Sequence, residues 1–284
     1  MNLTTQDVSC ANTVSSLRTD PFAGDELTRD DFLGGAVRIW QPKDGYRAGV
    51  DPVLLAASIP AQAGETVLEL GCGGGAALAC LATRVPGITC TGVEVQPAYA
   101  ALAQRNLDDN GLAGAVLCAD LSNLPPNVKS QRFDHVIANP PYFEDFRAVA
   151  ARSQERAVSR SGALPLEKWV SVASKRLKPG GVATFIQRAD RLPELMSAFF
   201  ACLGALELWP IHPRSTRPAR LVLLRGRKER RAAFVSHPPL VLHRGESHEK
   251  DADSYTENVS KVLRSACALP FPVQNRHLAR RGKP

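Results

Sequence analysis

The segment Asn139-Pro140-Pro141-Tyr142 has residue types that suggest chemistry directly. Two successive prolines stiffen the backbone and remove two N–H donors, so carbonyl oxygens are left to face a ligand. Asn139 Oδ1 and the Pro140 carbonyl can together accept both protons of a planar –NH₂ group, and the Tyr142 ring offers a face on which a flipped-out base can stack. The segment therefore predicts a site for attack by an exocyclic amino nitrogen, which needs alignment and preorganised acceptors rather than a covalent intermediate. A Pro-Pro turn after a buried strand is the alternative.

A glycine-rich segment follows the apolar run Thr66–Leu70 and precedes a helical run that begins at Ala76. Its glycines, Gly71, Gly73 and Gly75, let the backbone turn sharply and let a ligand approach the main chain without meeting a Cβ atom. In this strand–turn–helix context the spacing favours a nucleoside site. A tight structural turn is the alternative interpretation.

Acidic residues accompany the ends of successive predicted strands. Glu69 lies just before the glycine segment, where a carboxylate disfavours a diphosphate and favours a cation such as the sulfonium of S-adenosylmethionine. Glu94 can accept hydrogen bonds from both ribose hydroxyls, and Asp120 can meet an exocyclic amine. Taken singly, Glu94 can be an ordinary strand-end acid and Asp120 an N-cap or turn residue. Together they predict a nucleoside pocket.

These residues require a parallel sheet to bring them together. After Gly64 the chain alternates between short apolar runs and helical stretches, which predicts an open, doubly wound α/β sheet with crossover helices. The expected strands are Thr66–Leu70, Ile88–Val93, Ala115–Ala119, Phe133–Ala138, Val182–Gln187, Leu206–Ile211 and Leu221–Arg225. The expected helices lie near 76–84, 97–110, 165–178 and 190–203, with another from about Thr256.

The N-terminal part shows weaker patterns. Val37 to Trp40 alternates like a strand and is followed by turn residues at 42–45, which predicts a short hairpin or cap. Asp51 stands at a predicted helix N-cap.

Three regions are expected along the chain. Residues 1–30 form a flexible leader, 31–265 a single catalytic domain, and 266–284 a basic tail. Within the domain, 31–63 form an N-terminal cap and 64–228 the core sheet.

The composition favours a polyanionic partner. Lys and Arg number 35 against 28 Asp and Glu, for a formal charge of +7. The seven cysteines form no C-x-x-C pair, which indicates a reducing compartment. A cytoplasmic location and no metal are expected, and no apolar stretch is long enough to span a membrane.

Arginines supply candidate contacts to a phosphate backbone. Arg214, Arg217 and Arg220 lie between the last two predicted strands, and Arg147 lies in a basic stretch after Phe143. The planar guanidinium suits phosphate oxygens, so these residues predict RNA binding. A solvated charged hairpin is the alternative.

With both motifs in place, the sequence resembles the class I S-adenosylmethionine-dependent amino-methyltransferases. Within that class it is similar to the bacterial tRNA adenine-N6 methyltransferase family, which modifies adenine 37, beside the anticodon of a valine tRNA. The supporting stretches are Gln41–Arg47, Asp51–Ala56, Ile211–Arg214, Leu240–His243 and Tyr255-Thr256-x-Asn258.

The resemblance covers roughly residues 33 to 265. It implies a Rossmann-like, seven-stranded and mostly parallel sheet whose last strand is antiparallel, with S-adenosylmethionine as cofactor and structured RNA, most specifically tRNA, as substrate. It also implies that Arg47 and Asp51 border the cofactor pocket, and that Asn139 adjoins the cofactor as well as the acceptor amine.

Other functions fit parts of the pattern. A protein glutamine N5-methyltransferase of release factors could use the same Asn-Pro-Pro-Tyr acceptors, but such enzymes carry a sizeable helical domain before the glycine segment. An rRNA adenine-N6 methyltransferase is a further alternative. A DNA adenine methyltransferase is disfavoured because no long target-recognition region follows, and a non-catalytic RNA-binding module is disfavoured by the intact tetrad.

Overall fold

The computed structural model describes residues 18–141, 164–245 and 254–272. The strands are β1 (Leu27–Phe32), β2 (Val37–Pro42), β3 (Thr66–Leu70), β4 (Thr89–Glu94), β5 (Gly114–Cys118), β6 (Phe133–Ala138), β7 (Leu177–Arg188), β8 (Gly204–His212), β9 (Leu221–Arg227), β10 (Val235–Ser236) and β11 (Leu240–Val241). The α-helices are α1 (Asp51–Ser58), α2 (Ala76–Arg84), α3 (Pro97–Asp109), α4 (Pro126–Ser130), α6 (Leu166–Arg176), α7 (Leu192–Cys202) and α8 (Glu257–Ser265). Short 3₁₀ turns are η1 (Gly24–Glu26), η2 (Leu33–Gly35), η3 (Leu121–Asn123) and η5 (Ala189–Arg191).

The central sheet has the order β5-β4-β3-β6-β7-β9-β8. β3 to β7 pair in parallel, whereas β9 lies antiparallel between β7 and β8. The doubly wound α/β fold and its antiparallel last strand are therefore confirmed. Over the described residues the sheet has nine strands rather than seven, because β10 and β11 add two short parallel pairings along β8.

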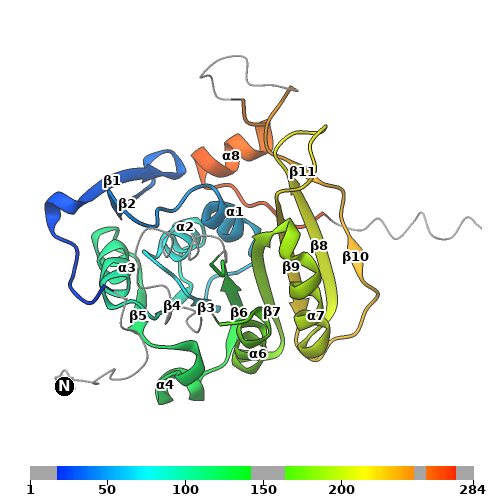
Figure 1. Ribbon diagram of the computed structural model, residues 1–284, viewed down its shortest axis with the longest axis horizontal. Helices are drawn as coiled ribbons and strands as arrows, with labels where there is room; N and C mark the ends of the chain where they lie inside the picture. Colours follow the sequence, from blue (N-terminus) through cyan, green and yellow to red (C-terminus); the bar gives the residue numbers. More distant parts are fainter. Residues whose placement is uncertain (1–17, 142–163, 246–253, 273–284) are drawn as a thin grey trace, which may run out of the picture.

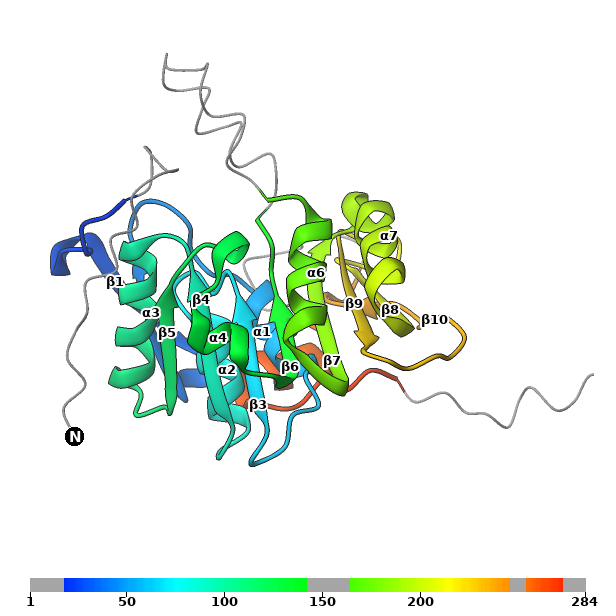
Figure 2. The ribbon, with the colours of Figure 1, turned by 90° about the horizontal axis from the view of Figure 1, so that it is seen from below.

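Helices cover both faces of the sheet (Figures 1 and 2). On one face, α1, α2, α3 and α8 enclose a core that includes Leu54, Leu78 and Leu107. On the other face, α4, α6 and α7 enclose a second core that includes Phe185 and Phe199, whose rings meet edge to face with centroids 5.2 Å apart. The sheet is apolar on both sides because crossover helices cover both of its faces.

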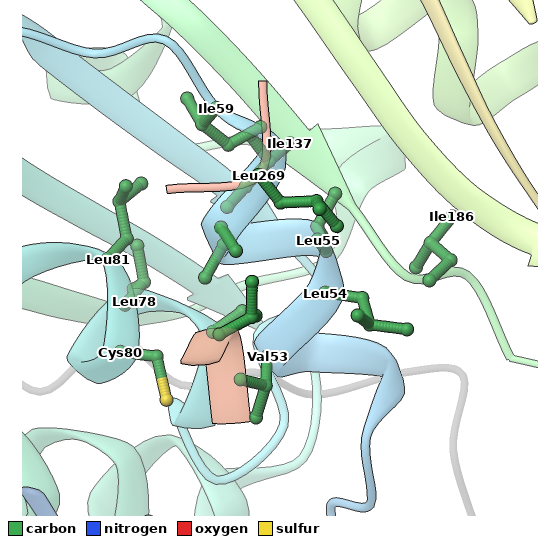
Figure 3. Packing of buried hydrophobic residues seen from close by; sticks show 14 of the residues in the cluster. Val53, Leu54, Leu55, Ile59, Leu78, Cys80, Leu81, Ile137, Ile186 and Leu269 are labelled. Carbon is green, nitrogen blue, oxygen red and sulfur yellow. The ribbon is translucent and has the colours of Figure 1, made fainter. Parts of the chain in front are cut away.

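The first core is centred on α1 (Figure 3). Leu54 and Leu55 are fully buried between the strands and α2, and Leu269 from the C-terminal segment packs into the same cluster. The Leu269 N–H donates to the Ala57 carbonyl at 2.8 Å, which anchors this segment to α1.

Two predicted region boundaries are corrected. The leader was expected to reach residue 30, but β1 starts at Leu27 and pairs with β2 from Leu27↔Pro42 to Phe32↔Val37. The tail was expected from residue 266, but Leu269 and Phe271 are buried. In both places long-range packing, which the local composition does not reveal, orders the chain.

One further expectation is corrected: α1 begins at Asp51 itself, with Val50 as its N-cap. The β1–β2 hairpin turns at η2, and the chain bends again at 43–45 after β2. After β9 the chain contributes β10 and β11, because its backbone pairs with the otherwise open edge of β8.

Candidate functional site

The carboxyl ends of the parallel strands meet at one edge of the sheet. Leu70 pairs with Val93 on one side and with Ala138 on the other, and Glu94 pairs with Cys118. The residues that follow these strands are therefore neighbours, which is the usual position of a ligand crevice in an open α/β sheet. The structure brings the glycine segment, the three acids and Asn139-Pro140 to this edge.

The glycine segment turns tightly over the end of β4. The N–H groups of Gly71 and Cys72 both donate to the Val93 carbonyl, at 2.8 and 3.1 Å. Gly71, Gly73 and Gly75 have φ values of 64°, 52° and 79°, which side chains with a Cβ adopt at a cost. The predicted need for glycine is therefore borne out by the backbone itself.

Glu94 holds this segment from the next strand. It is buried, its Oε2 accepts the Gly73 N–H at 2.9 Å, and its Oε1 accepts the Gln96 N–H at 2.9 Å. Each carboxylate oxygen can accept about two hydrogen bonds, so both oxygens retain acceptor capacity for hydroxyl groups. Burial raises the pKa of Glu94, while the N–H groups of Gln96 and Gly73 act in the opposite direction.

Glu69 lies deeper than the sequence suggested. Its side chain is only 3% exposed, and its Oε2 has no hydrogen-bond partner among the described residues. Burial raises the pKa of Glu69 well above 4.5, the Leu78 N–H in the first turn of α2 opposes that rise, and the nearby charge of Glu94 adds to it. Glu69 is therefore buried against the first turn of α2, and its contact with a cation stays a prediction.

Asp120 has the local role that was left open as an alternative. Its Oδ1 accepts the Ser122 N–H at 2.7 Å, and it is the N-cap of η3. It is half-buried at the edge, two residues after the end of β5, the strand that pairs with β4. Contact with a cofactor adenine stays a prediction.

At the end of β6, Asn139 is half-buried and Pro140 is buried. Gln187 from β7 donates to the Pro140 carbonyl at 3.2 Å. The other two predicted residues of this region, Tyr142 and Arg147, lie outside the described residues.

Arg47 is bound to the N-terminal hairpin. Its guanidinium donates to the Asp30 carboxylate at 2.6 Å and to Thr28 Oγ1 and the Pro42 carbonyl, each at 2.8 Å. Asp51 opens α1. The contact of either residue with a cofactor stays a prediction, and the hairpin contacts give Arg47 a structural role.

The predicted phosphate-binding arginines do not share one environment. Arg214 is 7% exposed, and its Nη1 donates to the carbonyls of Arg244 and Gly245, so it braces the turn instead of lying open to RNA. Arg217 and Arg220 are exposed. Their turn lies at the edge that carries Asn139, because the Arg220 carbonyl accepts the Ala189 N–H just after β7.

Three residues that sequence reasoning missed also shape the edge. Asn106 of α3 is fully buried and donates from Nδ2 to the carbonyls of Gly74 and Trp40, at 2.9 and 3.0 Å. The Trp169 ring lies over Gly71, so that a Cβ there would come within 2.5 Å of Cη2. Tyr46 is 53% exposed, with its ring near Gly73. Periodicity alone could not distinguish any of them from an ordinary helix or loop residue.

This chemistry fits a nucleoside with a cationic group. The glycine segment offers backbone without Cβ atoms, Glu94 retains acceptor capacity for ribose hydroxyls, and Glu69 presents a buried acceptor without a partner in the described part of the chain. Buried acids disfavour an anionic ligand such as a diphosphate.

The family model of the methyltransferase small domain matches residues 48–206. The chain belongs to the methyltransferase small domain family. The matched residues include the glycine segment, the three acids and Asn139-Pro140. The family and the class I fold are those of S-adenosylmethionine-dependent enzymes, and S-adenosylmethionine is the cofactor.

Relatives of this chain carry a more specific name. A Porphyromonas gingivalis protein named tRNA1(Val) (adenine(37)-N6)-methyltransferase is 34% identical over 156 residues, which is 53% of this chain and 58% of the relative. A Yersinia pestis protein of the same name is 29% identical over 188 residues, 63% of this chain and 73% of the relative. The match thus spans less than two thirds of the Porphyromonas relatives, 58% and 61% of their lengths.

A solved structure agrees with the fold. The crystal structure of a predicted O-methyltransferase from Agrobacterium tumefaciens superposes with a TM-score of 0.63 at 26% identity, and covers 78% of this chain and all of that one. None of the helices in the described ranges has the length and apolar character needed to cross a membrane.

Proposed function

We propose that this protein transfers a methyl group from S-adenosylmethionine to the N6 amino group of an adenine in tRNA, with adenine 37 of a valine tRNA as the specific target. The observation that carries the proposal is the position of Asn139 and the Pro140 carbonyl at the sheet edge, beside the glycine segment and Glu94. The names of the Porphyromonas and Yersinia relatives support the choice of tRNA and nucleotide.

The acceptors act on the amine before and during transfer. Asn139 Oδ1 and the Pro140 carbonyl accept hydrogen bonds from its two N–H groups, which favours a pyramidal nitrogen whose lone pair is free to react, and the nitrogen releases one proton once its new N–C bond has formed. S-Adenosylmethionine, when bound, supplies the electrophilic methyl group. Glu94 holds the ribose, and the glycine segment aligns the two reactants, which is the main source of rate where no covalent intermediate forms.

RNA is held by exposed arginines near the same edge. Arg217 and Arg220 are the described candidates, since the Arg214 guanidinium donates to backbone carbonyls of the protein itself. A second basic group, which includes Arg230 and Arg231, follows the C-terminal end of β9. At that end, Arg227 pairs with Val182 of β7. That end is opposite the catalytic edge, so Arg230 and Arg231 provide a matched control for arginines that contact substrate.

The test is nucleoside mass spectrometry after incubation with labelled S-adenosylmethionine. The full chain would be given, in parallel, bulk tRNA, ribosomal RNA and purified release factors, with Asn139→Ala as the inactive control. We expect N6-methyladenosine in tRNA, mapped to position 37 of the valine species, and no label with Asn139→Ala.

Each other outcome changes the proposal in a defined way. Label in release-factor glutamine would identify the protein methyltransferase alternative, and label only in ribosomal RNA would move the substrate to the ribosome. Full activity of Asn139→Ala would refute the mechanism. We also propose a cytoplasmic location, because the similar proteins are named for the modification of tRNA.

A further inference from the structure

Gln187 is fully buried, and its side-chain amide lies beside the Pro140 carbonyl, which is proposed to accept a hydrogen bond from the target amine. It lies near the carboxyl end of β7, two residues beyond the last β6–β7 pair, Ala138↔Phe185, and opposite Val222 of β9. Its Nε2 donates to the Pro140 carbonyl at 3.2 Å.

The orientation of this carboxamide is fixed by its other end. Gln187 Oε1 accepts the Arg188 N–H at 2.8 Å. A flipped amide would place its –NH₂ against the Arg188 N–H and its oxygen against the Pro140 carbonyl, so both contacts would become repulsive. The amide therefore presents a donor, and only a donor, to Pro140.

A side chain donates to the Pro140 carbonyl because the neighbouring backbone has no N–H group available to do so. Pro140 and Pro141 lack N–H groups, and the pairing of β6 with β7 ends at Ala138. The Pro140 carbonyl adjoins a buried environment, where an acceptor without a donor is costly. Gln187 supplies that donor and ties the Asn139-Pro140 segment to the rigid strand β7.

We propose that Gln187 is a positioning residue for methyl transfer: it occupies one lone pair of the Pro140 carbonyl and directs the other toward the proton of the acceptor amine. The inference rests on the proposed function of Asn139 and Pro140. Gln187 acts through Pro140 and does not touch the substrate. A purely structural role would instead require only that the side chain fill its space.

Two substitutions separate these roles. Gln187→Met keeps an unbranched side chain of similar size but donates no hydrogen bond. Because small displacements of acceptors cost up to roughly 100-fold in rate, we expect the single-turnover rate to fall roughly 10- to 100-fold while the Kd for S-adenosylmethionine stays within about twofold. Gln187→Glu restores a donor only when its carboxyl is protonated.

The pH profile of Gln187→Glu provides the readout that a space-filling role would not change. A protonated carboxyl can donate to the Pro140 carbonyl and accept the Arg188 N–H, whereas a carboxylate repels that carbonyl. Burial raises the pKa of such a carboxyl. The rate of this variant relative to the unaltered protein should therefore rise as the pH falls through that pKa.

The assay is single-turnover transfer of labelled methyl to bulk tRNA over a pH series, with calorimetry for cofactor affinity. Gln131→Glu, at an exposed position before β6, is the matched control and should follow the unaltered protein at every pH. Should Gln187→Met fail to fold, the profile of Gln187→Glu still decides.

The outcomes separate this inference from the proposed function. A Gln187→Met rate equal to that of the unaltered protein, or a constant rate ratio for Gln187→Glu across the pH series, would overturn the positioning role alone. Absence of methyl transfer by the unaltered protein to any acceptor would overturn both.

Discussion

Replacement of Glu94 by alanine tests the proposed cofactor pocket most directly. Each carboxylate oxygen accepts one hydrogen bond from a backbone N–H. The Gly73 N–H donates to Oε2 and the Gln96 N–H to Oε1, both at 2.9 Å. The remaining acceptor capacity suits the two hydroxyls of a ribose. The variant would therefore lose ligand contacts and also release the Gly73 N–H from its anchor.

The magnitude follows from the type of hydrogen bond. A hydrogen bond to a charged group contributes about 1.5–3 kcal/mol, and the loss of one such bond corresponds to an increase in Kd of roughly 10- to 100-fold. Loss of both ribose contacts would exceed that range, and water that enters the space would reduce the effect. We therefore expect the Kd for S-adenosylmethionine to increase at least about 10-fold.

Isothermal titration calorimetry measures this Kd, and thermal unfolding checks that the variant is folded. Glu167→Ala is the matched control, because Glu167 is an exposed glutamate on α6 and its removal deletes the same atoms and charge. A folded Glu94→Ala protein with a Kd within twofold of the unaltered protein would refute the assignment of Glu94 to the ribose.

Three further predictions concern the loop, the buried acid and the RNA contacts. Gly71→Ala should lower the free energy of unfolding, measured by urea titration, by more than Gly111→Ala does. Both glycines have positive φ, but only at Gly71 would a Cβ meet the overlying Trp169 ring. Equal losses of stability in the two variants would contradict this packing. Glu69 has a folded-state pKa well above its ordinary 4.5, so its contribution to stability is lost as pH rises from 4.5 through the folded value. The melting temperature of Glu69→Gln should therefore rise relative to that of the unaltered protein as pH rises. A difference in melting temperature that does not depend on pH would argue against this. Replacing Arg217 and Arg220 with alanine should flatten the log–log salt dependence of tRNA affinity by roughly one to two units with cofactor affinity unchanged, and an unchanged slope would mean that these side chains are only solvated.

Strands, helices and motif positions follow closely from local sequence. β3, the glycine segment and α2 fall where the apolar runs and glycines predicted them, because each pattern is set by neighbouring residues. The meeting of Glu94 and Asn139 at one edge could also be predicted, since parallel strands bring their carboxyl ends together.

Other features depended on contacts between distant segments. The β1 sequence carries three charged residues and has no strong strand pattern, yet it pairs fully with β2. Arg214 and Arg217 are the same residue type in the same turn, but only Arg214 has backbone carbonyls from residues 244 and 245 within reach, and it is buried for that reason.

The sequence by itself determined the fold class, the glycine segment and the position of the Asn139-Pro140 segment after a buried strand, because these depend on periodicity and backbone chemistry within a few residues. Only the tertiary structure decided which polar side chains support the motif. Gln187 lies in an apolar strand with nothing in its neighbourhood to mark it, and its contact with Pro140 exists because β7 pairs beside β6. Hydrogen bonds of this kind join residues far apart in the chain, so local sequence patterns cannot specify them.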